Sequence, residues 1–379
     1  MSAYKVIDGD GHVFEWEETF SDQFLDEEYH HRRPVIVDGP QQLLWAVDNV
    51  TYPGLYGDRL SFGGSPVSRA GIRRDSIVPK PESLGVLEMR EPDERIAVHL
   101  DEGIDVAVIY PTLLLIRPLS FDLGFESALC RSYNSWIAHV CSTRPDELKW
   151  VAVIDMNDPE AAAREIVRCK KLGAVGVMLP GMNGKSSITE RRYDPIWAAC
   201  EQENLAVGVH VAYCTPLDQY TFVFSLLMGF EQVAASGVLD RFPRLRVSFL
   251  EASCNWVPFM VERAEEKANP ERNRFAPTRP LDTVIDRPEQ GGYRSQLSPY
   301  EYIRRGNLWF GFEVEDPLLP YCIEHFGDDC WVYGSDIPHG DRLKDAAKVL
   351  QKRSDISDDA KRKLLRDNVA RYYDMPVAE

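Results

Sequence analysis

Short apolar runs alternate with longer stretches of helical periodicity along most of the chain. Apolar runs bounded by polar or turn-forming residues are typical of buried strands. Their alternation with helical segments indicates β-α-β units and a parallel sheet. The eight expected strands cover residues 4–8, 104–110, 149–154, 174–179, 206–211, 246–250, 307–312 and 331–335.

The stretches between these strands carry apolar residues at helical spacing. One of them begins with Asp158 and Pro159, a capping residue followed by proline at the first helical position, and ends before Gly173. The alternation predicts an α/β fold, a (β/α)8 TIM barrel that forms a single domain over residues 1–379. The expected helices cover residues 123–142, 159–172, 193–203, 220–236, 256–269, 317–326 and 357–373.

Two segments, residues 39–95 and 270–300, break the alternation because they are rich in glycine, proline and arginine. We expect them to be insertions in loops at the C-terminal face of the barrel, where long loops shape the substrate pocket. Basic residues in the first segment suit either an anionic substrate, such as a carboxylate or a coenzyme A thioester, or a solvated loop. These residues are Arg69, Arg73, Arg74 and Lys80.

The charge and cysteine content narrow the class of protein. The chain has 43 Lys and Arg against 60 Asp and Glu, a formal net charge of −17, which repels nucleic acid and anionic membrane surfaces. No apolar run reaches the roughly 18 residues that a membrane span needs, and we expect no secretory signal. The eight cysteines form no CxxC pair and are expected to be reduced, buried thiols of a cytoplasmic protein.

Polar side chains gather where the expected strands end. Asp8, Asp10 and His12 alternate in the first segment, so they share one face of an extended chain. Because parallel barrel strands end at one rim, the side chains at the other strand ends should meet them there. So many carboxylates cannot all ionise together unless one or two divalent cations offset their charge. The candidate metal ligands are Asp10, His12, Glu15, His210, Glu251, Glu313, Asp336 and His339.

Each candidate has a structural alternative when it is considered alone. His210 fits a core histidine, Glu251 a partner for an arginine, and Asp336 a helix cap. Asp8 fits a supporting carboxylate better than a ligand. The metal interpretation therefore rests on the joint occurrence of these residues at strands one, five, six, seven and eight. The remaining histidines fit surface or structural positions, and Cys254 has no neighbouring base in sequence for nucleophilic chemistry.

These motifs resemble the amidohydrolase superfamily, and within it the amidohydrolase-related barrels that include aminocarboxymuconate-semialdehyde decarboxylase. In that branch a first-strand HxH pair, a fifth-strand His and an eighth-strand Asp hold one metal. The resemblance implies that His12, His210 and Asp336 are ligands. Asp10 stands at the first His position, and Glu251 stands where many relatives have a catalytic His. The resemblance covers almost the whole chain and is carried by residues 7–12, 100–111, 133–136, 193–197, 208–210, 251–256 and 334–339.

The carboxylates that replace histidines favour iron or manganese over zinc. The DxDxHxxE form of the first motif resembles a subgroup that includes nonheme dinuclear iron oxygenases, such as the diterpenoid monooxygenase of platensimycin and platencin biosynthesis. We therefore expect a homodimeric monooxygenase with two iron ions, or a manganese–iron pair, per chain. It would use dioxygen to hydroxylate an unactivated C–H bond of a small molecule, with Glu251, Asp336 and His339 as catalytic residues. The alternative is a decarboxylase or hydrolase with one manganese or zinc ion, in which Asp336 or Glu251 is the general base.

Overall fold

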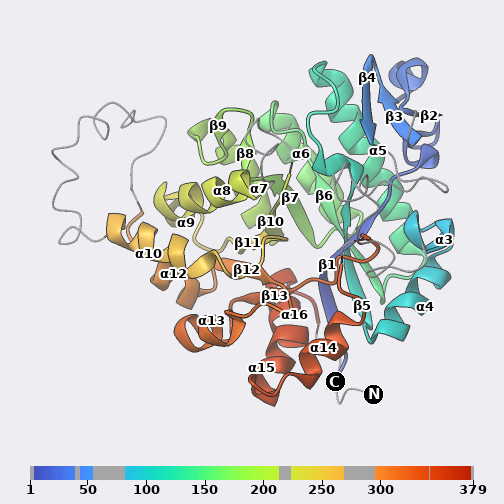
Figure 1. Cartoon of the computed structure of the whole chain (residues 1–379). Coiled ribbons are helices and arrows are strands. Elements are labelled where there is room, and N and C mark those ends of the chain that lie inside the picture. The colour runs from blue at the N-terminus through green and yellow to red at the C-terminus, as the bar shows by residue number, and fades with distance from the viewer. Residues whose placement is uncertain are drawn as a thin grey trace.

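The computed structural model describes residues 4–38, 43–53, 82–212, 223–268, 295–340 and 342–376. Eight strands form one sheet in which every neighbouring pair is parallel. Figure 1 shows these strands at the centre of the molecule with helices around them. In spatial order the strands are β1 (Ile7–Val13), β5 (Val106–Pro111), β6 (Leu148–Val153), β7 (Gly176–Pro180), β10 (Ala206–His210), β11 (Val247–Leu250), β12 (Leu308–Phe312) and β13 (Trp331–Tyr333).

The first and last strands meet and close the sheet into a (β/α)8 barrel. The backbone N–H of Asp336, just after β13, donates to the carbonyl of Asp10 at 3.0 Å. The N–H of His12 donates to the carbonyl of Ile337 at 2.6 Å. The TIM-barrel prediction is therefore confirmed, and each of the eight expected strands is present within a few residues of its expected position.

Strand β1 begins and ends later than the expected 4–8, so Asp10 and His12 lie within it rather than after it. Glycine makes this polar strand possible. A side chain at Gly9 would place its Cβ 2.7 Å from Val332 of β13, and one at Gly11 would lie 2.8 Å from the Asp8 carboxylate. Gly9 therefore allows β1 to approach β13 closely, and Gly11 leaves room for the Asp8 carboxylate within β1.

The expected helices are present with small shifts of their ends. The Asp158 side chain accepts a hydrogen bond from the N–H of Ala161, which confirms the predicted helix cap. Of the helix expected at 220–236, residues 220–222 lie outside the described chain. The helices are α5 (Leu123–Ser142), α6 (Pro159–Lys171), α7 (Asp194–Gln202), α8 (Phe224–Ala235), α10 (Val257–Ala268), α13 (Leu319–Phe326), and α15 (Asp358–Arg362) and α16 (Asn368–Tyr373), which are joined by a π-helical turn.

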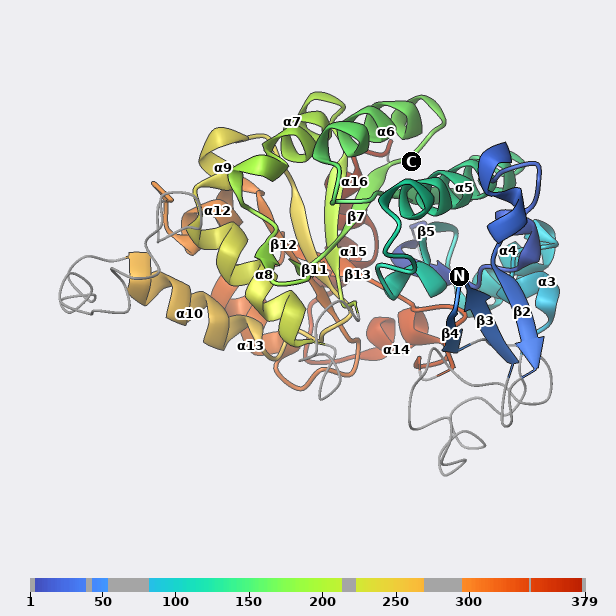
Figure 2. The ribbon, with the colours of Figure 1, turned by 90° about the horizontal axis from the view of Figure 1, so that it is seen from above.

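Part of the first expected insertion has regular structure that the sequence did not indicate. An antiparallel three-stranded sheet precedes residues 54–81, which lie outside the described chain. Figures 1 and 2 show it at one side of the barrel, near α5. Of the second insertion, only residues from 295 onward are described. The additional elements are β2 (Val35–Asp38), β3 (Leu43–Val47), β4 (Val50–Pro53), α3 (Leu84–Leu87), α4 (Pro92–Glu102), α9 (Val238–Arg241), α12 (Pro299–Arg305), α14 (Ala346–Lys352) and the hairpin of β8 (Met182–Asn183) with β9 (Ser186–Ser187).

Tyrosines of helix α16 pack against the barrel strands beneath the metal-binding candidates. The Tyr373 hydroxyl donates to the carbonyl of Gly9 at 2.7 Å and lies 2.8 Å from the Tyr110 hydroxyl. The Tyr110 ring lies between this contact and the imidazole of His210, with ring centroids 5.3 Å apart. Gly208 leaves room for Tyr110, because a Cβ there would be 2.3 Å from the Tyr110 hydroxyl.

The described cysteines are buried and free, as expected; Cys214 lies outside the described residues. No helix among the described residues is long and apolar enough to span a bilayer.

Candidate metal centre

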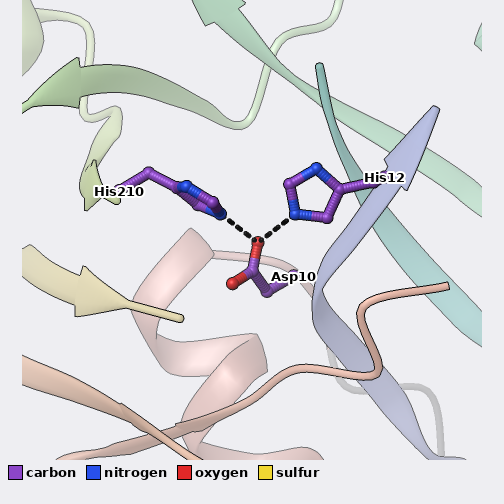
Figure 3. A group of neighbouring side chains, drawn as sticks. All are labelled: Asp10, His12 and His210. Carbon is purple, nitrogen blue, oxygen red and sulfur yellow. Dashed lines mark ion pairs between the residues drawn. The ribbon is translucent and has the colours of Figure 1, made fainter. Parts of the chain in front are cut away.

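Asp10, His12 and His210 meet at the C-terminal end of the barrel. One oxygen of Asp10 lies 3.6 Å from His12 Nε2 and 3.4 Å from His210 Nε2. Figure 3 shows the Asp10 carboxylate between the two imidazoles, which come from β1 and β10. Each of the three residues therefore offers one ligand atom to a common point, within 4.8 Å of the other two.

The two imidazoles are oriented by backbone carbonyls. His12 Nδ1 lies 2.7 Å from the carbonyl oxygen of Pro111, and His210 Nδ1 lies 2.9 Å from that of Val211. A carbonyl can only accept, so each Nδ1 carries a proton and each Nε2 faces the other residues of the group, where it can ligate a metal once it is deprotonated. This arrangement is the usual one for a histidine that ligates a metal through Nε2.

A second group shares His12 with the first. Asp336 Oδ1 lies 3.5 Å from His12 Nε2 and 2.5 Å from His339 Nδ1. The His339 ring stacks on the His12 ring with centroids 4.1 Å apart, and its Nε2 lies 2.9 Å from the Thr112 hydroxyl. His12, Asp336 and His339 thus form another set of ligand atoms within 4.8 Å of one another.

Glu251 adjoins the first group from the end of β11. Its Oε2 lies 3.2 Å from His210 Nε2, and its side chain is 23% exposed, whereas the Asp10 side chain is 8% exposed. Glu251 and Asp336 both have left-handed backbone conformations, with φ of 61° and 56°. Non-glycine residues adopt this conformation at a cost of about 1–3 kcal/mol, and such strain is concentrated at functional sites.

The electrostatics of the cluster suit a divalent cation. Asp10 Oδ1, His12 Nε2 and His210 Nε2 are buried and have no hydrogen-bond partner among the described residues. Burial lowers the pKa of His12 and of His339 well below the usual histidine value, so both imidazoles are neutral and able to ligate. Burial alone would also lower the pKa of His210, but the charges of Asp10 and Glu251 raise it to about 9.

A cation at the common point would take the place of the His210 proton and satisfy all three buried atoms. Neutral imidazoles combined with carboxylates suit manganese, iron or zinc. The residues present therefore fit a divalent transition metal.

Glu251 and two further predicted ligands, Glu15 and Glu313, belong to neither group. The Glu15 carboxylate accepts hydrogen bonds from the backbone N–H groups of Thr112, Leu113 and Leu114. Glu313 is exposed at the end of β12. These positions correct the expectation that all the strand-end carboxylates crowd around the cations. Fewer carboxylates therefore lie in the ligand groups than the sequence indicated, so less negative charge there needs a second metal ion to offset it.

Three supporting residues complete the surroundings of the site. Asp8 accepts from the N–H of Asp10 and from Ser335, which agrees with the supporting role expected for it. The Arg95 guanidinium, fully buried, donates to the carbonyls of His12 and Ile337 at 2.5 Å each. Sequence reasoning missed Arg95 and Thr112. Thr112 directly follows β5, and its position at a strand end was a signal that could have identified it.

A model of the amidohydrolase family matches residues 7–375. The chain belongs to the amidohydrolase family. A gamma-resorcylate decarboxylase of Rhodococcus jostii is 31% identical to this amidohydrolase over 249 residues, which cover 57% of this chain and 73% of the relative.

Solved structures agree on the fold. An amidohydrolase of Mycobacterium avium superimposes with a TM-score of 0.74 at 22% identity, with 100% of each chain covered. A 5-carboxyvanillate decarboxylase of Novosphingobium aromaticivorans with bound manganese superimposes with a TM-score of 0.68 at 18% identity, with 98% of each chain covered.

These relatives correct the functional prediction. The curated relative is a decarboxylase, so the prediction of a dinuclear iron monooxygenase, an oxidoreductase, is wrong. The resemblance to the dinuclear iron subgroup gains no support, and neither do dioxygen, a coenzyme A thioester or a dimer. The alternative of a metal-dependent decarboxylase agrees with the relatives.

Proposed function

We propose that this amidohydrolase is a metal-dependent decarboxylase of small aromatic carboxylic acids. The observation that carries the proposal is the convergence of Asp10, His12 and His210 on one point, with Asp336 3.5 Å from the same His12 nitrogen. The curated relative acts on gamma-resorcylate, an aromatic carboxylate, and so supports the substrate class. A manganese-bound structural neighbour supports the choice of metal.

We further propose one metal ion per chain, held by Asp10, His12, His210 and Asp336. Because the Pro111 carbonyl holds the proton on His12 Nδ1, His12 has a single lone pair to offer. Both candidate groups need that lone pair, and it can bind only one metal ion. The two groups are therefore treated as parts of one metal site. Manganese is the expected metal, with zinc or iron as substitutes that the same donors accept.

A bound divalent cation would supply positive charge for holding the substrate's carboxylate and an adjacent oxygen. We assign the proton transfer to Glu251, and the position of its carboxylate, 3.2 Å from His210 Nε2, supports this assignment. The Glu251 carboxyl group would donate its proton to the ring carbon that bears the carboxylate. The bond between that ring carbon and the carboxylate then breaks, and carbon dioxide leaves. The electron pair of the broken bond restores the aromatic ring, and Glu251 regains a proton from water. His339 would hold Asp336 through Nδ1.

The proposal is tested with the purified chain, manganese and a panel of hydroxybenzoic acids under anaerobic conditions in D2O. We expect carbon dioxide release and one deuterium at the carbon that lost the carboxylate. His210→Asn should abolish both metal binding and turnover, whereas His31→Asn, at an exposed position, should change neither. Metal-loaded chain that releases no carbon dioxide from any member of the panel would overturn the proposal.

A further inference from the structure

We infer that Glu15 is a positioning residue that holds the metal-binding imidazoles in place through the turn after β5. The inference rests on the metal centre of the proposed function but not on its substrate. It assigns a role to a carboxylate that the sequence suggested as a ligand and that the structure keeps out of both ligand groups.

The Glu15 carboxylate holds three consecutive peptide groups. Oε2 accepts from the N–H of Leu113 at 2.7 Å and of Thr112 at 3.1 Å, and Oε1 accepts from the N–H of Leu114 at 3.1 Å. These N–H groups begin a short 3-10 turn (Leu113–Leu115), where the backbone provides them with no partner. Glu15 is 1% exposed, so water does not compete for these bonds. Hydrogen bonds in such a low-dielectric setting hold the backbone of the turn in place.

The same turn contacts two imidazoles of the metal centre. The carbonyl of Pro111 accepts from His12 Nδ1 at 2.7 Å. The hydroxyl of Thr112 lies 2.9 Å from His339 Nε2. These two rings stack on each other, and both approach Asp336. A shift of the turn would therefore rotate His12 and His339 together and move His12 Nε2 away from Asp10 and Asp336.

The chain offers a matched control for this role. Glu126 is another buried carboxylate that accepts from consecutive backbone N–H groups, those of Leu119 at 2.9 Å and Ser120 at 3.0 Å, in the loop that follows the same turn. No described contact joins that loop segment to a metal-site imidazole. A purely structural role for Glu15 predicts that the two carboxylates respond alike, whereas a positioning role predicts that they differ.

The experiment measures manganese affinity by calorimetry and the electron paramagnetic resonance spectrum of bound manganese, with no substrate present. Glu15→Gln should weaken manganese binding about 10- to 100-fold, the range found when partners behind metal ligands are removed, and should broaden the spectrum. Glu126→Gln should leave both unchanged. Thr112→Val should weaken binding in the same direction, and Thr112→Ser should restore it because the hydroxyl is kept.

Each outcome decides the inference. Equal manganese affinity in Glu15→Gln and Glu126→Gln would overturn it and leave Glu15 a structural residue. If Glu15→Gln fails to fold, the test uses the two variants Thr112→Val and Thr112→Ser. Equal manganese affinity in these two variants would also overturn the inference. A parent chain that binds no manganese would overturn it together with the metal centre. If the variants show the predicted differences in manganese affinity but the parent chain decarboxylates none of the acids, only the proposed function is refuted.

Discussion

Asp8 and Ser335 join strand β1 to the segment that directly follows β13, the last strand of the barrel. The Ser335 hydroxyl donates to Asp8 Oδ2 at 2.5 Å, and its backbone N–H donates to Oδ1 at 2.9 Å. The same hydroxyl accepts from the N–H of Ile337 at 3.1 Å. Asp8 and Ser335 therefore fix β1, which carries Asp10, relative to the segment after β13, which carries Asp336.

Replacing Ser335 tests this connection. Ser335→Ala would leave one Asp8 oxygen and the Ile337 N–H without their partner in a buried setting, at a cost of about 2–3 kcal/mol in the free energy of unfolding. The control is Ser132→Ala, which removes a buried hydroxyl that donates only to the carbonyl of Thr19 and should cost about 1 kcal/mol. Urea unfolding of the metal-free variants measures both. Equal losses of unfolding free energy in the two variants would show that the Asp8–Ser335 contact stabilises the fold no more than an ordinary buried hydroxyl does.

The fold was predictable because barrel strands buried on both faces appear in sequence as apolar runs. Strand β1 does not follow this rule towards its C-terminal end, because Asp10 and His12 are polar and glycines stand at positions 9 and 11, where a side chain would meet Val332 or the Asp8 carboxylate. The three-stranded sheet of β2, β3 and β4 was not predicted, for a different reason. Its strands are short, and β3 and β4 lie within the segment 39–95, whose glycine and proline content indicates loops.

The site was predictable only as far as strand geometry determines it. Strand ends bring Asp10, His12, His210 and Asp336 to one rim whatever the loops do. Glu15 follows the strand by two residues, and at that distance its carboxylate reaches the peptide groups after β5 instead. Spacing along the chain could not reveal this, because those donors are about a hundred residues away. The oxygenase prediction rested on the resemblance of the DxDxHxxE motif and on a surplus of carboxylates for a second metal, and Glu15 does not join either ligand group.

Gly334 is expected to be essential for placing Asp10. A Cβ at position 334 would lie 2.8 Å from the Cβ of Asp10, an atom fixed by the backbone of β1 that cannot rotate away. Gly334→Ala should therefore displace the Asp10 carboxylate and weaken manganese binding by roughly 10- to 100-fold. Gly184→Ala is the control: its φ of 59° makes alanine costly, but nothing lies within 4 Å of the added Cβ. Calorimetric titration should show normal affinity for the control, and normal affinity for Gly334→Ala would contradict the prediction.

Glu126 should make the stability of the metal-free chain depend on pH. Burial raises its pKa from 4.5 to about 7, although hydrogen bonds from Ser120 and Leu119 oppose the shift. The folded state therefore holds this proton more tightly than the unfolded state does. The resulting stability is present below pH 4.5 and is lost as the pH rises through about 7. A shift from 4.5 to about 7 corresponds to roughly 3 kcal/mol.

Glu126→Gln should remove this part of the pH dependence, so that the variant gains stability relative to the parent between pH 5 and pH 8. The measurement is urea unfolding at both pH values. Glu160→Gln, at an exposed position of α6, should keep the parent's profile. Parallel profiles for the parent and Glu126→Gln would show that the carboxylate titrates normally in the fold.

Replacing Glu251 is expected to affect turnover without affecting metal binding. Its carboxylate contacts His210 at 3.2 Å but belongs to neither group of mutually close ligand atoms, and its side chain is more exposed than that of Asp10. Glu251→Gln keeps the shape and removes the proton that the proposed reaction requires. It should retain one manganese ion per chain while kcat falls about 10²- to 10⁴-fold, the range for loss of a general acid. Glu313→Gln, at the exposed end of the next strand, should change neither quantity.

Elemental analysis measures the metal content of each variant, and the rate of deuterium incorporation into the product measures its turnover. Two manganese ions in the parent and one in Glu251→Gln would instead make Glu251 a ligand of a second ion, while full turnover in the variant would assign the proton transfer to another group.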